Sequence, residues 1–203
     1  MFEDTYLTIK ERSEGIYKEK GSKFISLAFP VSNENEVKDI IKDIKKEYYD
    51  ARHHCYSYIL GFDKSTFRMN DDGEPSSTAG KPIYGQLLSK DLTNILVVVI
   101  RYFGGTKLGV SGLINAYKQA TIDVLNNSCI IEKTVNELYS VSFEYVLMND
   151  VMKILKEFDV IQQNHRFEMD CYLEFITRKS NSVKIVDNLS SISNVSVKFL
   201  SLI

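Results

Sequence analysis

The alternation of apolar and polar residues in the first part of the chain predicts a mixed sheet with two main helices. Apolar side chains occupy alternate positions over 25–31, as in a half-buried strand, and run uninterrupted over 95–100, as in a strand buried on both faces. Apolar residues at helical spacing predict a first helix after residue 33, which Asn33 or Ser32 can cap. The same spacing predicts a second helix from about Gly112 to 126–128. The expected strands cover residues 6–9, 22–31, 55–60, 66–69 and 95–100.

A second pattern, which begins near residue 137, predicts a ferredoxin-like domain. Its expected elements follow the order β-α-β-β-α-β, with Asn149 as the cap of the first helix. The expected strands begin near Ser140, Val160, Phe167 and Val195. All 10 glycines and all 3 prolines lie at or before Gly112, so the two parts differ in composition. We therefore expect an α+β protein with one domain over residues 1–130 and a ferredoxin-like domain over residues 137–203.

The overall composition is that of an ordinary globular protein, with 44% apolar residues, 26% charged residues and a formal charge of −2. Residues 137–203 hold 7 Lys or Arg and 9 Asp or Glu, which leaves 18 of each sign before residue 137. Neither part has the basic field of a general nucleic-acid binder, and the expected open sheet face of the second domain is rich in carboxylates, which disfavours RNA binding there.

The cellular location is predicted from the cysteines and from the apolar runs. The 3 cysteines are far apart and odd in number, which favours reduced thiols and a cytoplasmic protein. The start of the chain is acidic and without an apolar core, so we expect no signal peptide. The longest apolar run is 6 residues, which predicts no membrane span.

The strand over 95–100 leads through a glycine-rich turn into a helix. Glycine permits positive φ, and the free N–H groups of a helix N-terminus attract anions, so this turn is a candidate phosphate or sulfate site. The lysine of a P-loop is missing because Val110 follows Gly109, and the alternative that the glycines only build a tight turn stays open. The candidate binding residues here are Arg101, Gly104, Gly105, Lys107, Gly109 and Ser111, whose hydroxyl can cap the helix.

The long loop over 70–82 combines acidic and hydroxyl residues, and a loop of this length is often functional. An EF-hand register fails because Arg68 and Ala79 would stand at its first and last ligand positions. A Mg²⁺ ion completed by a phosphate substrate and a simple acidic surface turn are both compatible with the sequence, and the hydroxyls are suited to cap a helix that starts near Pro82. The candidate binding residues here are Asp71, Asp72, Glu74, Ser76, Thr78 and Lys81.

The run His53-His54-Cys55 suggests zinc or a thiol nucleophile, but its spacing favours neither. On a strand His53 and Cys55 face one way and His54 the other, and no C-x-x-C partner exists. Adjacent strand positions do not hold a histidine beside a thiol. We therefore expect Cys55 to be a core residue and the histidines to be polar packing, and we predict no catalytic residue, metal or cofactor.

Three motifs together resemble the IMPACT family in its bacterial YigZ-type form: ARHHCYSY (51–58), NDDGEPSSTAGKP (70–82) and VIRYFGGTKLG (99–109). The resemblance implies a first domain like the second domain of a small-subunit ribosomal protein and a C-terminal domain like the last domain of elongation factor G. Eukaryotic relatives are translation regulators that damp a starvation-activated kinase by competing for its activator. The family usually has Gly where this chain has Ser77, and often Gly where it has Ser111.

Two functional hypotheses follow. The first is a non-enzymatic regulator of translation that binds the ribosome, RNA or a translation-associated protein through the first domain. The second is an enzyme or binding protein that acts on a phosphorylated small molecule at the cleft of residues 71–82 and 101–111. The sequence shows no positioned pair of base and nucleophile, which favours the first hypothesis.

Overall fold

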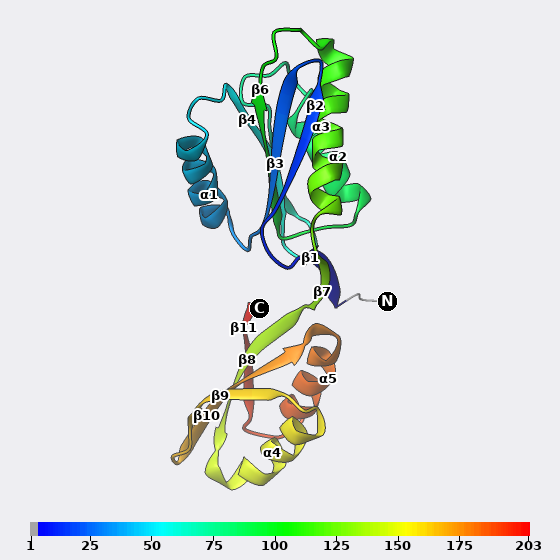
Figure 1. Cartoon of the computed structure of the whole chain (residues 1–203). Coiled ribbons are helices and arrows are strands. Elements are labelled where there is room, and N and C mark those ends of the chain that lie inside the picture. Colours follow the sequence, from blue (N-terminus) through cyan, green and yellow to red (C-terminus); the bar gives the residue numbers. More distant parts are fainter. Residues whose placement is uncertain (1–3) are drawn as a thin grey trace. The chain divides into compact units, whose positions relative to one another are not determined.

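A computed structural model describes residues 4–203 of the chain (Figure 1). Residues 1–3, which contribute to the expectation about a signal peptide, lie outside the described residues. The described chain divides into a first unit, Tyr6–Lys133, and a second unit, which comprises Thr134–Ile203 together with Asp4 and Thr5. Within residues 4–203, no helix combines the length and the apolar character that a membrane crossing requires.

The first unit is built on a five-stranded sheet with the strand order β2-β3-β6-β4-β5 (Figure 1). A separate two-stranded sheet pairs β1 (Thr5–Ile9) with β7 (Ile130–Thr134). The five strands are β2 (Ser13–Glu19), β3 (Ser22–Pro30), β4 (His53–Leu60), β5 (Thr66–Asn70) and β6 (Ile95–Tyr102).

The α+β class is confirmed, but the expected mixed sheet is antiparallel in every one of its four strand pairs. The strands β3 and β4 run parallel to each other, because both pair antiparallel with β6, which lies between them. The helix α1 (Glu34–Glu47) therefore connects two parallel strands that are not hydrogen-bonded to each other. Of the two candidate caps, Asn33 and Ser32, the structure selects Asn33, whose Oδ1 accepts hydrogen bonds from the N–H groups of Asn35 and Glu36.

Helices cover both faces of this sheet, which explains the uninterrupted apolar run of β6 (Figure 1). Leu96, Val98 and Ile100 belong to one core cluster with residues of α1. Val97 and Val99 belong to another cluster with residues of α2 (Gly80–Ser89) and α3 (Gly109–Asn126). The sheet is thus the middle layer of three, and its odd-numbered β6 residues point toward α2 and α3.

The second unit has the predicted ferredoxin-like order, with an antiparallel sheet ordered β11-β8-β10-β9. Apolar residues of both helices join those of the strands in one core cluster. The elements are β8 (Asn136–Glu144), the 3₁₀ turn η1 (Tyr145–Leu147), α4 (Met148–Glu157), β9 (Ile161–Arg166), β10 (Asp170–Arg178), α5 (Lys179–Ser190) and β11 (Ser196–Leu202).

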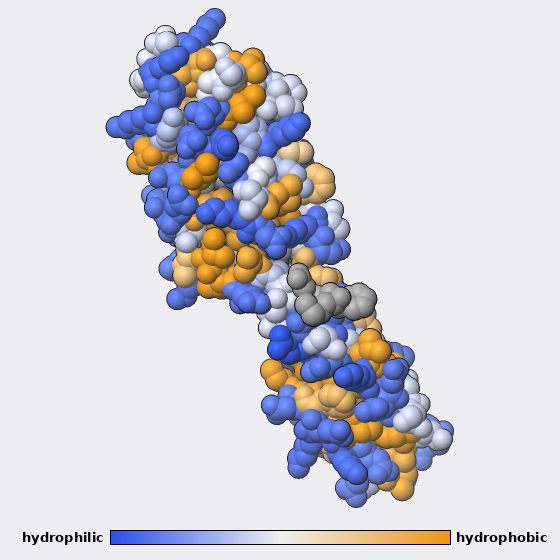
Figure 2. All heavy atoms as spheres, turned by 90° about the vertical axis from the view of Figure 1, so that its right-hand side faces the viewer, coloured by the Kyte–Doolittle hydropathy of each residue, from blue (hydrophilic) through white to orange (hydrophobic). Residues whose placement is uncertain are grey.

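Two local expectations for the second unit are wrong. The strand expected from Phe167 begins at Asp170, because Phe167 and Met169 lie exposed in the β9–β10 turn although they continue the alternation of the strand. Asn149 does not cap α4, because that helix continues directly from η1, and the residue at its N-cap is Leu147. On the face shown in Figure 2, hydrophilic and hydrophobic residues are interspersed over the surface of both units.

Candidate functional site

Strand β6 carries Arg101 into the interior of the first unit. Arg101 continues the row of Val97 and Val99, so it lies on the sheet face that α2 and α3 cover. Its neighbours in the register are His53 on β4 and Phe24 on β3, and its guanidinium carbon lies 5.6 Å from the centroid of the Phe24 ring. Only 7% of Arg101 is exposed, so the sheet holds a positive charge in an almost fully buried position.

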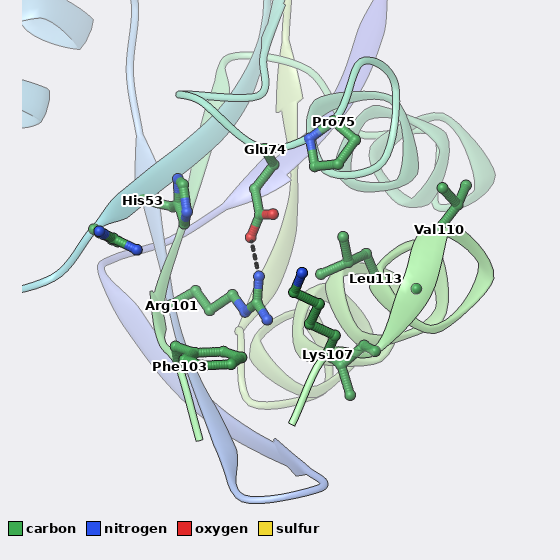
Figure 3. Close-up of a pocket in the computed structure, with 11 residues that line it drawn as sticks. His53, Glu74, Pro75, Arg101, Phe103, Lys107, Val110 and Leu113 are labelled. Carbon is green, nitrogen blue, oxygen red and sulfur yellow. Dashed lines mark hydrogen bonds and ion pairs between the residues drawn. The ribbon is translucent and has the colours of Figure 1, made fainter. Parts of the chain in front are cut away.

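Glu74 neutralises this buried charge. Arg101 Nη1 donates a 2.6 Å hydrogen bond to Glu74 Oε1 (Figure 3), and the hydroxyl of Tyr117 on α3 donates to the same oxygen at 2.9 Å. Arg101 Nε is buried and has no hydrogen-bond partner among the described residues. A buried guanidinium therefore keeps unused donor capacity at this point of the fold.

A pocket of about 420 Å³ opens beside this ion pair (Figure 3). Its walls come from the start of β4, from the loop before α2, from the end of β6 and from the start of α3. In Figure 3 the side chain of Lys107 extends toward Arg101 and Glu74, and Phe103 lies beneath the guanidinium. The lining residues are Arg52, His53, Glu74, Pro75, Arg101, Phe103, Lys107, Leu108, Gly109, Val110 and Leu113.

The pocket contains more positive than negative side chains. Arg52 and Lys107 are exposed, and among the described residues neither takes part in an ion pair. Within the part of the chain that the structure describes, Glu74 is the one carboxylate in the lining, and it is already paired with Arg101. The two exposed cations therefore leave an uncompensated positive charge at the mouth of the pocket, which favours an anionic ligand.

Asp71 has a structural role in the loop before α2. Its Oδ1 accepts hydrogen bonds from the N–H groups of Ala79 and Gly80 at 3.0 and 2.8 Å, and its Oδ2 accepts from Ser77 N–H at 2.9 Å. These bonds satisfy free donors at the start of α2, so Asp71 performs the capping that we expected of the hydroxyl residues. Thr78 instead donates its hydroxyl proton to the Pro75 carbonyl at 2.6 Å.

Asp72 also has a structural role, because it ties the loop to β4 and α1. Its carboxylate accepts from His54 N–H at 2.7 Å and from Lys45 Nζ at 2.9 Å. Burial alone would raise the pKa of Asp72, but these partners outweigh it and hold the pKa below its usual range. Among residues 4–203 no group of three or more His, Cys, Asp or Glu side chains is placed to hold a metal ion.

Cys55 is a buried core residue. Its thiol lies 2.9 Å from the Asp71 carbonyl oxygen and 3.3 Å from the Tyr117 hydroxyl. Burial raises the pKa of the Cys55 thiol and of the Tyr117 phenol, so both groups stay protonated at neutral pH. A thiol in this state is a poor nucleophile.

The glycine turn combines a packing role with a helix start. A Cβ on Gly104 would stand 1.9 Å from the carbonyl carbon of Gly21, so Gly104 permits a close backbone contact with the β2–β3 turn. Gly105 and Gly109 have φ of +89° and +74°, which favours glycine. The capping role expected of Ser111 is wrong, because α3 begins at Gly109 and Ser111 lies inside its first turn.

The pocket contains four of the twelve residues that the sequence indicated, namely Glu74, Arg101, Lys107 and Gly109. The other eight do not line it: Asp71, Asp72, Ser76, Thr78, Lys81, Gly104, Gly105 and Ser111. Sequence reasoning missed Arg52, His53, Phe103 and the apolar wall. The signal for Arg52 and His53 was their place in the first motif of the family, and His53 is fixed by a 2.8 Å hydrogen bond between its Nδ1 and the Asp72 carbonyl.

Comparisons with known proteins agree on one family. The model of the Impact N-terminal domain matches residues 20–125. The IMPACT family member YvyE of Bacillus subtilis is 34% identical over 84% of this chain and 80% of its own length. The IMPACT family member YigZ of Escherichia coli is 33% identical over 69% of this chain and 70% of its own length.

A solved structure extends the similarity to nearly the whole chain. A crystal structure described as that of a hypothetical protein matches with a TM-score of 0.72 at 27% identity, over 98% of this chain and 97% of its own. The three motifs therefore occur within a chain whose sequence matches known members of the IMPACT family over most of its length. This chain belongs to the IMPACT family.

Proposed function

We propose that this protein is a non-enzymatic, cytoplasmic regulator of translation that binds the ribosome, RNA or a translation-associated protein through the pocket of its first unit. The observation that carries the proposal is the convergence of Arg52, Arg101 and Lys107 on one pocket, in which Glu74, the one carboxylate among the described lining residues, is already paired. Membership of a family whose eukaryotic relatives regulate translation supports the translational context.

The chemistry around the pocket favours binding over catalysis. Cys55 and Tyr117, a potential nucleophile and a potential acid–base group that are linked to Glu74 by hydrogen bonds, are held protonated by burial. Glu74 Oε1 accepts two hydrogen bonds from buried donors, which commits that oxygen to the structure. Cys55 donates to Tyr117 and Tyr117 donates to Glu74, but burial keeps the thiol protonated, so this hydrogen-bonded chain does not supply the activated nucleophile that covalent catalysis requires.

The test is co-sedimentation with ribosomes over a salt series. Lys107→Glu reverses a charge that lines the pocket, so ribosome binding is expected to weaken. The affinity should also depend less steeply on salt, with the magnitude of the slope of log affinity against log salt concentration reduced by about one. Lys118→Glu is the matched control, because it makes the same charge change on an exposed position of α3 outside the pocket lining. Equal effects of the two changes would contradict the assignment of the pocket.

The size of the pocket favours a second candidate, a protein that acts on a phosphorylated small molecule. Its volume of about 420 Å³ falls in the range of roughly 300–1,000 Å³ that is usual for such sites. This candidate predicts turnover of a phosphate ester and no sedimentation with ribosomes at low salt. The same sedimentation assay therefore separates the two candidates.

A further inference from the structure

We infer that the pocket of the first unit binds a nucleotide through a terminal phosphate, either as a free mononucleotide or as the phosphorylated end of an RNA strand. The inference rests on the proposed function, because it names the chemistry that the same pocket recognises. For such a ligand, the pocket must hold a phosphate with two negative charges and must offer a surface for a planar base. It must also favour the end of a strand over an internal phosphodiester.

The proposed phosphate-binding site combines a buried cation with the N-terminus of a helix. Arg101 is about nine-tenths buried, lines the pocket and keeps Nε without a partner among the described residues. The N-terminus of α3, with Gly109 and Val110, lines the same pocket, and Leu108 at its N-cap offers no side-chain acceptor to its first N–H groups. Unsatisfied backbone donors and a guanidinium are the groups that bind phosphate oxygens in proteins.

The charge of the pocket matches a phosphate monoester. The Arg101–Glu74 pair is neutral as a whole, so the net charge comes from Arg52 and Lys107. A phosphate monoester carries a charge close to −2 at neutral pH because its second pKa is about 6. An internal phosphodiester carries one negative charge and would leave one of the two cations without a partner.

The pocket is larger than a phosphate group, and its remaining walls suit a base. Phe103 is 54% exposed although its ring lies beneath the Arg101 guanidinium at 5.6 Å. Pro75, from the loop that carries Glu74, and Val110 and Leu113, from α3, supply apolar surface (Figure 3). Aromatic side chains beside cations bind bases by stacking, with little dependence on base identity.

The position of the buried arginine favours the end of a strand. Arg101 lies on an inner sheet strand and is flanked by β3 and β4, so a ligand reaches it from the pocket and not from the edge of the sheet. A volume of about 420 Å³ admits roughly one nucleotide, and a terminal nucleotide fills it without a second stretch of strand having to pass the buried arginine.

Calorimetric titration of the full chain tests the inference with adenosine 5′-monophosphate, adenosine 3′-monophosphate, adenosine and inorganic phosphate. At least one monophosphate is expected to bind about tenfold or more tightly than adenosine. Lys107→Gln is expected to weaken that binding by about tenfold or more, whereas Lys118→Gln leaves it unchanged. Equal binding of adenosine and both monophosphates, or equal effects of the two variants, would overturn the inference.

Phe103→Ala separates the base from the phosphate. It is expected to weaken nucleotide binding by about tenfold and to change the binding of inorganic phosphate by less than about twofold. A hexanucleotide with and without a 5′-phosphate identifies the source of the ligand. Tighter binding of the phosphorylated strand than of the mononucleotide assigns an RNA end, and tighter binding of the mononucleotide assigns a free nucleotide.

The ribosome assay distinguishes failure of this inference from failure of the proposed function. If ribosome binding depends on Lys107 while no monophosphate binds, the nucleotide inference is wrong and the regulator proposal stands. If a monophosphate binds through Lys107 while ribosomes do not, the nucleotide inference stands and the ribosome is ruled out as the partner in the regulator proposal.

Discussion

Asp72 shows how single residues of the acidic turn stabilise the first unit. Its carboxylate is 23% exposed and joins three segments, since it lies between β5 and α2, accepts from the backbone of β4 and pairs with Lys45 on α1. The neighbouring Asp71 and Glu74 make equally specific contacts, with the start of α2 and with Arg101. A cluster that resembles a metal or substrate site in sequence is therefore divided among three separate structural roles.

Asp72→Asn is expected to lower the free energy of unfolding at pH 7 by about 1–2 kcal/mol, because it removes the charge that Lys45 and His54 N–H stabilise. The pKa of Asp72 is lower in the folded state than in the unfolded chain. The stabilisation by the Asp72 carboxylate is therefore fully present at pH values above the pKa of Asp72 in the unfolded chain. It is lost as pH falls through the pKa of Asp72 in the folded protein. The difference in the free energy of unfolding between Asp72→Asn and the wild type should therefore become smaller below about pH 4.

Urea denaturation of both proteins at pH 7 and pH 3.5 measures this difference. Asp43→Asn serves as the control, because Asp43 pairs with Lys46 on the exposed face of α1 and should contribute less than about 0.5 kcal/mol. A difference for Asp72→Asn that stays constant with pH would contradict the assigned role of the carboxylate.

At the scale of elements, the path from β6 to α3 determines the pocket. The strand ends at Tyr102, and the chain then passes Gly104 against the backbone of the β2–β3 turn before it enters α3 at Gly109. Gly104 N–H also donates to Ser22 Oγ at 3.1 Å. This contact anchors the segment from which Phe103 and Lys107 reach the pocket.

Two glycine substitutions are expected to have opposite effects. A Cβ at Gly104 would stand within 2.2 Å of three backbone atoms, so Gly104→Ala should destabilise the protein by about 1–3 kcal/mol or more. A Cβ at Gly85 in α2 meets nothing within 4 Å, and Gly85→Ala should stabilise the helix by about 0.5–1 kcal/mol. Thermal unfolding of both variants tests this, and destabilisation by both would contradict the packing role of Gly104.

At the scale of the whole molecule, the two units have separate cores. The first unit buries two clusters, one on each face of its sheet, and the second unit buries one. The expected boundary between two domains, at residues 130–137, stays a prediction. The loop over 70–82 is held in place by hydrogen bonds from the N–H groups of Ser77, Ala79 and Gly80 to the Asp71 carboxylate.

Limited proteolysis is expected to cut first between residues 127 and 137, because β7 in this segment belongs to a two-stranded sheet, which opens more easily than a larger sheet. The loop over 70–82 is expected to stay intact. Mass spectrometry of the first fragments locates the cut. A first cut within 71–79 would contradict the bracing role of Asp71, and a chain that resists cleavage in both places would count against two domains.

Much of the fold followed from periodicity alone. The uninterrupted run of β6 and the alternation of β8 and β10 predicted which strands are covered on two faces and which on one, because burial selects apolar side chains position by position. The start of α1 was narrowed to two candidate caps, Asn33 and Ser32, because capping is a local interaction, and the structure selects Asn33. The antiparallel pairing of the five-stranded sheet could not be predicted, since it depends on β6 lying between β3 and β4, far away in the sequence.

The sequence by itself determined the chemistry at the candidate site, namely a glycine turn, Lys107 and Arg101 near a helix start. Only the tertiary structure decided which residues meet there. It placed Arg52 and His53 in the pocket through the register of β4 with β6, and it assigned Asp71 and Asp72 to structural hydrogen bonds. The reason is physical: a local pattern reports the environment of each residue, whereas a pocket depends on segments that become neighbours only when the sheet forms.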